Sequence, residues 1–230
     1  MPLRNIGSVD IFFHSWDLLE ITSNRAGEYG VKIDPQDFYH HLPDAIGHFD
    51  SQDEFDSTIN WREIYRKKIF SGFISERELM ESSLKNYVRS LESQQRALSV
   101  FKSMKEKSFD FVIAARPDVK FLHDLTVPIV KPDEIYIPTF HSWGGVNDRF
   151  ALGREDEIAI WLDKRQFALN IIKKGLRCNP EKIASEWLLN NKLTVKDLNF
   201  VFQRVRANGD IQLIDRDLAE NSDERGLKNQ

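Results

Sequence analysis

The chain has 230 residues, a length that corresponds to one domain or to one domain with an appendage. Hydrophobic residues make up 41% and charged residues 30%, which excludes a disordered chain and a disulfide-stabilised scaffold and indicates a globular protein with a sizeable core. Lys and Arg total 32 against 36 Asp and Glu, so the net charge of -4 lacks the positive field that binding a nucleic-acid backbone requires.

The sequence also indicates where the protein works. The lone Cys178 excludes an internal disulfide and a cysteine-based zinc site, and it is compatible with a reducing compartment. No apolar run approaches the roughly 20 residues that span a bilayer. Met1 to Ser8 contains no hydrophobic signal-peptide region. We therefore expect a cytoplasmic protein without a transmembrane segment.

The first half of the chain predicts one strand followed by helices. Val9 to His14 is a short apolar run that predicts a buried strand. Leu18 to Asp56 is irregular and polar, which suggests a long loop region with short helices. Asn60 can cap a helix that runs through Ile64, Ile69 and Phe70, and Ser75 with Glu78 has the spacing of a capping box. From Ser82 to Lys107, apolar residues recur at helical spacing and predict a long helix with one buried stripe.

The second half alternates strands and helices. Phe109 to Ala115 is apolar almost throughout, which is typical of a central strand covered on both faces, and a helix leading into it implies an α/β crossover. The further predicted elements are a strand at Ile135–Pro138, a Gly-rich loop at 141–149, helices at 155–174 and 180–189, and two strands, 200–205 and 211–214, joined by an Asn-Gly turn. We expect one domain over residues 1–214 and a charged tail over 215–230.

Arg116-Pro117-Asp118 follows the apolar strand, and open α/β sheets bind ligands at the carboxyl ends of their strands. Asp118 is a hard oxygen donor for Mg²⁺ or Mn²⁺, which bridges a diphosphate, and Arg116 could contact phosphate oxygens with two N–H groups. The alternative is that Pro117 and Asp118 merely end the strand in a turn and that Arg116 pairs with a surface acid.

The loop from His141 to Phe150 combines an aromatic side chain, paired glycines and several hydrogen-bonding groups. Such a loop suits a sugar, because Trp143 offers an apolar face to a pyranose ring and Asn147 and Asp148 match hydroxyl pairs. Asp148 could also act as a general base toward an attacking hydroxyl. The alternative is an ordinary turn with Trp143 as a core anchor, and the spacing leaves both interpretations open.

His14-Ser15-Trp16-Asp17 ends the first strand, so it occupies the same type of position as Arg116-Pro117-Asp118 and could converge with it. A histidine beside a tryptophan is more often a hydrogen-bonded structural residue than a catalyst. Glu181 and Glu186 fit a solvated helix face better than a site. The remaining histidines lack zinc spacing, and no nucleophile-elbow, P-loop or dinucleotide-binding motif occurs, which disfavours classical hydrolases, NTPases and dinucleotide oxidoreductases.

Three blocks, Val9 to Asp17, Phe109 to Asp118 and Ile137 to Gly153, occur in an order that resembles a group of GT-A-like glycosyltransferases from surface-polysaccharide clusters and large DNA viruses. That group carries a "D-x-F-x-H-x-W" strand, an "R-x-R-P-D" strand end and a "G-G-x-N-D-R-F" loop, and Glu181 lies in a segment that resembles its "P-E-x-x-L" helix. The resemblance implies a GT-A-like, Rossmann-like mixed sheet flanked by helices in a single domain.

The resemblance also implies roles for individual residues. Asp118 would match the metal-binding acid of the usual Asp-x-Asp motif, with Mn²⁺ or Mg²⁺ as the cation, while Arg116 stands where the first acid would be. Ala114 stands where the group often has its first arginine. His14, Trp16 and Asp17 would bind the nucleotide sugar together with Arg116 and Asp118. His141, Trp143 and Asn147 would bind the acceptor, and Asp148 would be the catalytic base.

One departure concerns the start of the chain. Relatives commonly begin with a strand that bears a Gly-x-x-Arg turn, whereas this sequence opens directly before what would be the second strand. A shortened chain, an element supplied by a neighbouring chain, or a divergent and inactive version would each account for the difference.

The leading hypothesis from the sequence is a glycosyltransferase that moves a sugar from a nucleotide-diphosphate donor to a hydroxyl of a glycan acceptor, in polysaccharide or glycoprotein glycan synthesis. A second hypothesis is a non-catalytic carbohydrate-binding or assembly module with the same fold, and a third is a purely structural interaction domain. Thermal stabilisation by a nucleotide diphosphate with a divalent cation distinguishes the first from the others.

Overall fold

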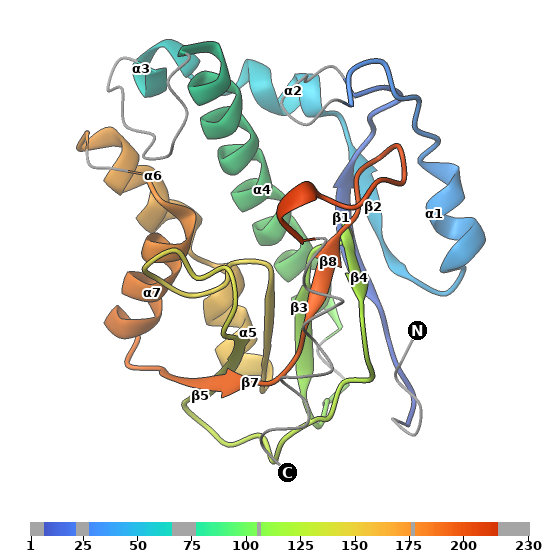
Figure 1. Cartoon of the computed structure of the whole chain (residues 1–230), viewed down its shortest axis with the longest axis vertical. Helices are drawn as coiled ribbons and strands as arrows, with labels where there is room; N and C mark the ends of the chain where they lie inside the picture. Colours follow the sequence, from blue (N-terminus) through green and yellow to red (C-terminus); the bar gives the residue numbers. More distant parts are fainter. Residues whose placement is uncertain (1–6, 22–27, 66–76, 105–106, 176–177, 216–230) are drawn as a thin grey trace.

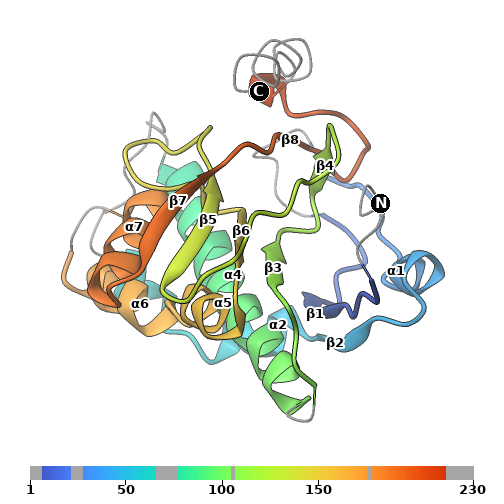
Figure 2. The same ribbon diagram turned by 90° about the horizontal axis from the view of Figure 1, so that it is seen from below.

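A computed structural model of the chain describes residues 7–21, 28–65, 77–104, 107–175 and 178–215. The protein is a mixed α/β structure in which a mixed sheet is flanked by helices, as the sequence predicts. Figures 1 and 2 show its main sheet between a helical layer and a short antiparallel strand pair.

The main sheet has four strands in the order β3 (Val112–Ala115), β6 (Phe150–Gly153), β5 (Glu134–Pro138) and β7 (Thr194–Leu198). β6 is antiparallel to both β3 and β5, and β5 is parallel to β7. In the register of β3 and β6, Ala115 lies opposite Phe150, so the loop before β6 meets the end of β3. This register decides which side chains meet at the candidate site.

Two further strand pairs complete the strand content of the described residues. β1 (Phe12–Trp16) is parallel to β2 (Ile46–Asp50), and β4 (Val119–Phe121) is antiparallel to β8 (Phe202–Arg204). Figure 2 shows β1 and β2 beyond the β3 end of the main sheet. No backbone pairing joins β1 to β3.

The helices cover the strands in separate groups. The long helix α4 (Arg77–Ser103) lies behind β1 and β3, and α5 (Glu155–Leu162) and α7 (Pro180–Asn190) cover one face of the main sheet. The other face packs against the β4–β8 pair. The remaining helices are α1 (Gln36–His41), α2 (Gln52–Ser57), α3 (Trp61–Tyr65), α6 (Arg165–Lys173) and a short 3-10 helix, Leu213–Asp215.

Several predictions from the sequence are confirmed. The helix expected from residue 82 is α4, and its apolar stripe is buried at Leu84, Val88 and Leu91 because it packs against α6 and its neighbours. The strands expected at residues 9–14 and 135–138 are β1 and β5, and the helix expected from residue 180 is α7. Asn60 caps α3, since its side-chain oxygen accepts a hydrogen bond from the Glu63 N–H at 3.2 Å.

Other predictions are wrong. Residues 18–56 contain the strand β2 in addition to helices, and β4, β6 and β7 were not foreseen. β3 is not a central strand, because among the strands of the described ranges it pairs with β6 alone and ends the main sheet. The helix expected at 155–174 is two helices, separated at Asp163 and Lys164. The strand expected at 211–214 is a single bridge between Val205 and Ile211 followed by the 3-10 helix.

Ile69, Phe70 and Ser75, which were assigned to predicted helices, lie outside the described residues, as does 216–230 of the expected tail. Asp215 itself belongs to the fold, because its carboxylate is buried and paired with Arg204 at 2.7 Å.

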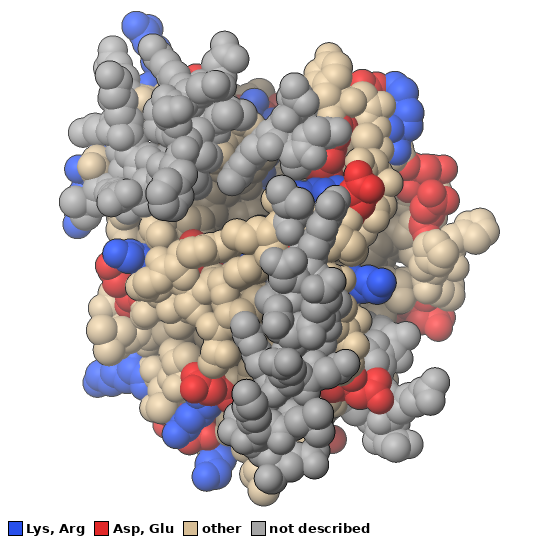
Figure 3. Space-filling view, viewed as in Figure 1, with Lys and Arg blue, Asp and Glu red and all other residues tan. Residues whose placement is uncertain are grey.

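The surface carries charges of both signs. In the view of Figure 3, Lys and Arg side chains alternate with Asp and Glu around the periphery, without a broad area of either sign. Within the described part of the chain, no helix combines the length and the apolar character needed to cross a bilayer.

Candidate functional site

A cleft of about 2570 Å³ runs between the β1–β2 pair and the main sheet. The side chains that line it include six of the nine site residues predicted from the sequence, namely His14, Trp16, Arg116, Asp118, Trp143 and Asp148. The other three, Asp17, His141 and Asn147, do not line it. The cleft therefore collects residues from the ends of β1 and β3, from the 141–149 loop and from the start of α7.

The pairing of β3 with β6 brings the strand end and the loop together. The N–H of Arg116 donates to the Arg149 carbonyl at 3.0 Å, one step beyond the last paired residues of the two strands. Asp148 therefore lies beside Arg116 at the carboxyl end of β3. This juxtaposition follows from an antiparallel register between segments more than thirty residues apart.

Arg149 links two carboxylates at this point. Its guanidinium lies 3.0 Å from the Asp148 Oδ1 and 3.2 Å from the Glu181 Oε1, and it stacks over the Trp143 ring at 5.0 Å. Arg149 is buried, so its charge is compensated mainly by these two acids. A paired, desolvated acid of this kind is held in a fixed position, as a catalytic carboxylate needs to be.

Glu181 is the acid that the sequence interpretation placed on a solvated helix face, and the structure places it in the site. It is buried at the first turn of α7, and burial together with the nearby charge of Asp148 raises its pKa, while Arg149 partly offsets the rise. Arg149 therefore holds Glu181 and Asp148 at the same point of the cleft. Asn179, Pro180 and Glu181 lie at the start of α7 because Asn179 caps the helix through the Lys182 N–H at 2.8 Å.

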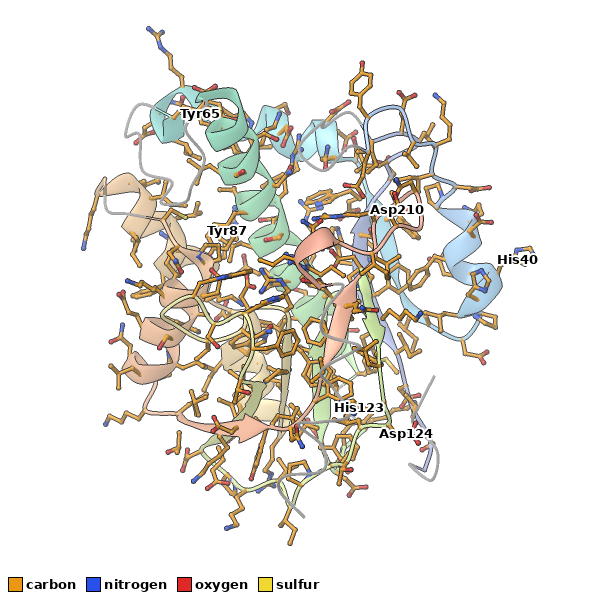
Figure 4. The ribbon with its side chains drawn as sticks, in the orientation of Figure 1. His40, Tyr65, Tyr87, His123, Asp124 and Asp210 are labelled. Carbon is orange, nitrogen blue, oxygen red and sulfur yellow. The ribbon has the colours of Figure 1, made fainter. Side chains whose placement is uncertain are left out.

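Tyr87 is a second residue that sequence reasoning missed as a site residue. It belongs to the buried stripe of α4, and Figure 4 shows it on the side of α4 that faces α6 and α7. Its hydroxyl has no hydrogen-bond partner among the described residues. Burial raises its pKa well above the usual value, and the charges of Cys178, Asp148 and Glu181 add to the rise. A neutral hydroxyl donor thus lies near the acid pair.

Arg116 and Asp118 are paired with each other. Both carboxylate oxygens of Asp118 accept hydrogen bonds from the Arg116 guanidinium, the Nε contact being 2.8 Å long. Burial in the cleft lowers the pKa of Arg116, but Asp118, Asp148 and Glu181 more than offset this effect and raise it overall. Its side chain is nevertheless 44% exposed, so the guanidinium is accessible to a ligand. A cation at Asp118 would have to displace this arginine.

The loop before β6 has an unusual backbone. His141 and Trp143 have φ values of 51° and 36°, in the left-handed region that non-glycine residues rarely adopt, and Gly144 follows at 83°. A Cβ on Gly145 would overlap the backbone of Glu181, so glycine permits the loop to approach α7. The glycines therefore serve the junction of the loop with α7.

This backbone presents Trp143 at the surface of the cleft. Trp143 is 45% exposed and stacks on His141, with ring centroids 5.0 Å apart and an angle of 6° between the planes. His141 lies behind it, 3.6 Å from Asp215, and burial lowers its pKa. The indole is thus held by the His141 ring and by the guanidinium of Arg149, and its exposed part borders the cleft.

Asn147 stabilises the 141–149 loop through hydrogen bonds to the backbone. It is fully buried, its amide donates to the Phe140 carbonyl at 2.9 Å, and its Oδ1 accepts from the Arg149 N–H at 3.0 Å. Asp17 accepts from the Gln52 N–H at 3.3 Å, at the start of α2. Neither residue faces the cleft, so both support local structure.

His14 belongs to a group of possible metal ligands. Among the described residues, His14, His48 and Asp50 form the one group whose ligand atoms all lie within 4.8 Å of one another. Each histidine Nε2 lies near the Asp50 Oδ2, at 3.2 and 3.3 Å, and Ser93 contacts His14 through its other ring nitrogen. Burial lowers the pKa of His14, which favours the neutral form that binds metals.

Arg96 competes with a cation for this group. Its guanidinium pairs with the same Asp50 oxygen and lies over the Trp16 ring at 5.3 Å, while Trp16 stacks on Phe55. The group could hold a metal ion if Arg96 moved away. Asp118, the metal ligand expected from the sequence, is not a member of it.

Comparison with protein-family models, with curated proteins and with solved structures found no match for this chain.

Proposed function

We propose that the protein is a glycosyltransferase that moves a sugar from a nucleotide-diphosphate donor to a hydroxyl of a glycan acceptor, on a GT-A-like fold. The observation that carries the proposal is the juxtaposition of Arg116 with Asp148 at the carboxyl end of β3, where α/β sheets bind their ligands. The block resemblance of the sequence supplies the reaction class. The acceptors would be those of polysaccharide or glycoprotein glycan synthesis.

The charges divide into a donor side and an acceptor side. Arg116 is accessible and remains protonated, so it can neutralise the diphosphate as the bond between the anomeric carbon and the phosphate oxygen breaks. Asp148 takes the proton of the acceptor hydroxyl as its oxygen bonds to the anomeric carbon. Arg149 and Glu181 fix the position of Asp148, and Trp143 offers its ring to a sugar face.

A divalent cation, Mn²⁺ or Mg²⁺, remains a prediction from the sequence. Because Asp118 is already paired through both oxygens, its present geometry does not fit a metal ligand. The donor side as described relies on Arg116.

The test is transfer by Asp148→Asn. We expect turnover to fall by about 10²–10⁴-fold, the usual contribution of a general base, while the donor still binds. Turnover is measured as release of nucleoside diphosphate from a panel of nucleotide sugars with a glycan acceptor mixture, and donor binding as a rise in melting temperature. The matched control is Asp156→Asn, which neutralises an exposed acid on α5. Turnover close to that of the wild type in Asp148→Asn would remove Asp148 from the base role.

A second candidate is a carbohydrate-binding module without transfer activity. The pairing of Asp118 with Arg116 favours it, because this pairing occupies both oxygens of the acid that would hold a cation, whereas Trp143 is exposed and rigidly held. In that case glycans quench the fluorescence of Trp143 and nucleotide sugars leave the melting temperature unchanged, with and without Mn²⁺. Stabilisation by a nucleotide diphosphate excludes this candidate.

A further inference from the structure

The pairing of β1 with β2 gathers three polar side chains on one face of the strand pair. His14 lies opposite His48 in the register, and Asp50 follows His48 by two positions. Side chains two positions apart on a strand share a face, so His14, His48 and Asp50 point to the same side. The opposite side carries Phe13 and Phe49, which pack on each other. The strands themselves therefore bring the three polar groups together.

Helix α4 covers this face and adds a hydroxyl and a guanidinium to the cluster. The Ser93 hydroxyl lies 2.9 Å from the His14 Nδ1 and donates to the His14 carbonyl at 3.1 Å. The Arg96 guanidinium pairs with the Asp50 Oδ2. Figure 1 shows α4 behind β1. The cluster thus lies between the strand pair and α4, and it reaches the surface at His48, whose side chain is half-exposed.

The hydrogen bonds of Ser93 fix the tautomer of His14. A hydroxyl has one hydrogen, and that of Ser93 goes to the His14 carbonyl. The contact between Ser93 and the His14 Nδ1 is then a hydrogen bond only if Nδ1 carries a proton and donates it. In a neutral ring the lone pair is consequently on Nε2, which lies 3.2 Å from the Asp50 Oδ2.

A nitrogen lone pair that faces a carboxylate oxygen requires a cation at that point. Either a second proton on the buried His14 ring or a bound metal ion supplies it. The His48 Nε2 lies 3.3 Å from the same oxygen, so two ring nitrogens and the Arg96 guanidinium converge on the Asp50 Oδ2. This convergence is the observation from which the inference starts.

The separations between the ligand atoms match those around a tetrahedral ion. Ligand atoms about 2.0–2.1 Å from a tetrahedral Zn²⁺ lie about 3.3–3.4 Å from one another. The two histidine nitrogens lie 3.2 and 3.3 Å from the Asp50 Oδ2. All three ligand atoms lie within 4.8 Å of one another, and rotation of the half-exposed His48 ring adjusts the third separation.

The surroundings of His14 also correspond to those of a metal ligand. A metal-bound histidine usually donates its other ring N–H to an oxygen acceptor, which fixes the tautomer and the orientation of the ring. Ser93 provides that acceptor, and the His14 carbonyl holds Ser93 in turn. His14 therefore presents Nε2 to an ion without rearrangement.

Arg96 has a second partner when it leaves the Asp50 Oδ2. Its Nε donates to the Glu92 Oε1 at 2.9 Å, one turn earlier on α4. Its guanidinium also lies over the Trp16 ring. An ion that displaces Arg96 from Asp50 thus leaves the arginine paired and not as an isolated charge.

We propose that His14, His48 and Asp50 bind one divalent transition-metal ion, with Zn²⁺ as the best-fitting ion, in exchange for the Arg96 guanidinium at the Asp50 Oδ2. Imidazole ligands select Zn²⁺, Cu²⁺ or Ni²⁺ over Mg²⁺, which prefers oxygen. Three protein ligands leave one position of a tetrahedral ion for water or a small anion, at the half-exposed side of His48. The site does not include Asp118, and the proposal does not rest on the proposed function.

The first test is a calorimetric titration of the full chain with Zn²⁺ after treatment with a chelator. One ion should bind per chain and raise the melting temperature, because it binds the native state. Mg²⁺ at the same concentration should do neither. Absence of saturable Zn²⁺ binding, or equal binding of Mg²⁺, overturns the proposal.

His48→Ala removes a ligand whose side chain is half-exposed, so the metal-free variant should melt close to the wild type. Its affinity for Zn²⁺ should fall by about 100-fold or more, since even changes next to a ligand cost about 10–100-fold. The matched control is His40→Ala, which removes an exposed histidine of α1 and should bind normally. Unchanged affinity in His48→Ala, or an equal loss in His40→Ala, would place the ion elsewhere and overturn the proposal.

Arg96→Met tests the exchange, and it predicts a gain that damage to the fold does not produce. The variant keeps an unbranched side chain over Trp16 and removes the competing charge, so the affinity for Zn²⁺ should rise about tenfold. Arg89→Met, which removes an α4 arginine paired with Asp56, should leave the affinity unchanged. Unchanged or weaker binding in Arg96→Met shows that Arg96 does not compete with the ion and overturns the exchange.

Ser93 is a positioning residue in this proposal, and the ring nitrogens of His14 report on it. In ¹⁵N spectra of the wild type, Zn²⁺ should shift the Nε2 resonance of His14 while Nδ1 keeps its proton. Ser93→Ala should weaken Zn²⁺ binding about tenfold, and Ser93→Thr, which keeps the hydroxyl, should restore it. A ring of His14 whose Nε2 does not respond to Zn²⁺ contradicts the assignment of this histidine as a ligand.

Discussion

The two parts of the molecule that border the cleft are built differently. In the main sheet, β5 and β6 are paired on both sides and covered on both faces, so Ile135, Ile137 and Leu152 are almost completely buried. Within the described residues the β1–β2 pair has no third strand, and most of its residues are only partly buried. The comparison teaches that the main sheet carries most of the stability through β5 and β6, and that the β1–β2 pair is weakly supported. β3, which borders the cleft, is itself only partly buried.

Matched isoleucine truncations test this difference most strongly. Ile137→Ala in β5 removes a buried side chain and should lower the free energy of unfolding by about 4 kcal/mol, whereas Ile46→Ala in β2 should lower it by only about 1–2 kcal/mol. Urea denaturation followed by circular dichroism measures both. Equal losses would mean that the β1–β2 pair is as tightly packed as the main sheet.

A buried lysine, Lys164, provides a test of how tightly the helices on the main-sheet side are packed. Lys164 is 1% exposed between α5 and α6, where its ammonium contacts the Trp161 carbonyl at 2.8 Å and the Gln94 side chain. Burial lowers its pKa from 10.5 to about 8, although Asp148 partly offsets the effect. Below pH 8 the ammonium is charged in both the native and the unfolded state, so its burial carries a constant cost.

Between pH 8 and 10.5 the native state has released this proton and the unfolded state has not, so the contribution of Lys164 to stability rises with pH, by about 3 kcal/mol in total. We expect the unfolding free energy of the wild type, minus that of Lys164→Met, to increase by that amount over this range. Lys173→Met, which removes an exposed lysine of α6, should follow the wild type. A flat difference would show that the ammonium is solvated.

The sequence predicted those elements whose residues carry their own pattern. The stripe of α4 and the apolar runs of β1 and β5 were found because burial on one helix face or within a strand leaves a periodic or continuous signal. β7 has no such apolar signal in the sequence, since four of its five residues are exposed and its place is set by pairing with β5. β2 contains Gly47, which argues against a strand although the fold needs it there.

The candidate site was predicted in part for a similar reason. Arg116, Asp118, Trp143 and Asp148 lie beside strand ends and could be found from that position, but the register that joins them could not. Tyr87 and Glu181 resembled ordinary helix residues, because their importance comes from burial near Asp148 and not from local pattern.

The same steric defect, an added Cβ that meets a backbone carbonyl, can be introduced at a glycine of the main-sheet side and at a glycine of the β1–β2 pair. A Cβ on Gly145 would overlap the Glu181 carbonyl of the main-sheet side, and a Cβ on Gly47 would overlap the Phe13 carbonyl within the β1–β2 pair. We expect Gly145→Ala to lower the free energy of unfolding by about 2 kcal/mol. Gly47→Ala should instead speed amide exchange in β1 and β2 while exchange in β5 and β6 stays unchanged. Gly7→Ala, which meets no neighbour, is the control for both.

The smallest expected effect comes from two helix caps. Asn179 accepts from the Lys182 N–H at the start of α7, and Ser51 accepts from the Glu54 N–H at the start of α2. Each alanine variant should lose about 1 kcal/mol of helix stability. Asn179→Ala should lower the global unfolding midpoint, because α7 covers the main sheet and carries Glu181, and it should also slow the proposed sugar transfer. Ser51→Ala should raise local exchange in α2 and shift the midpoint less, since α2 buries only Phe55 whereas α7 buries four residues. A larger midpoint shift for Ser51→Ala than for Asn179→Ala would reverse the assignment of stability to the main sheet.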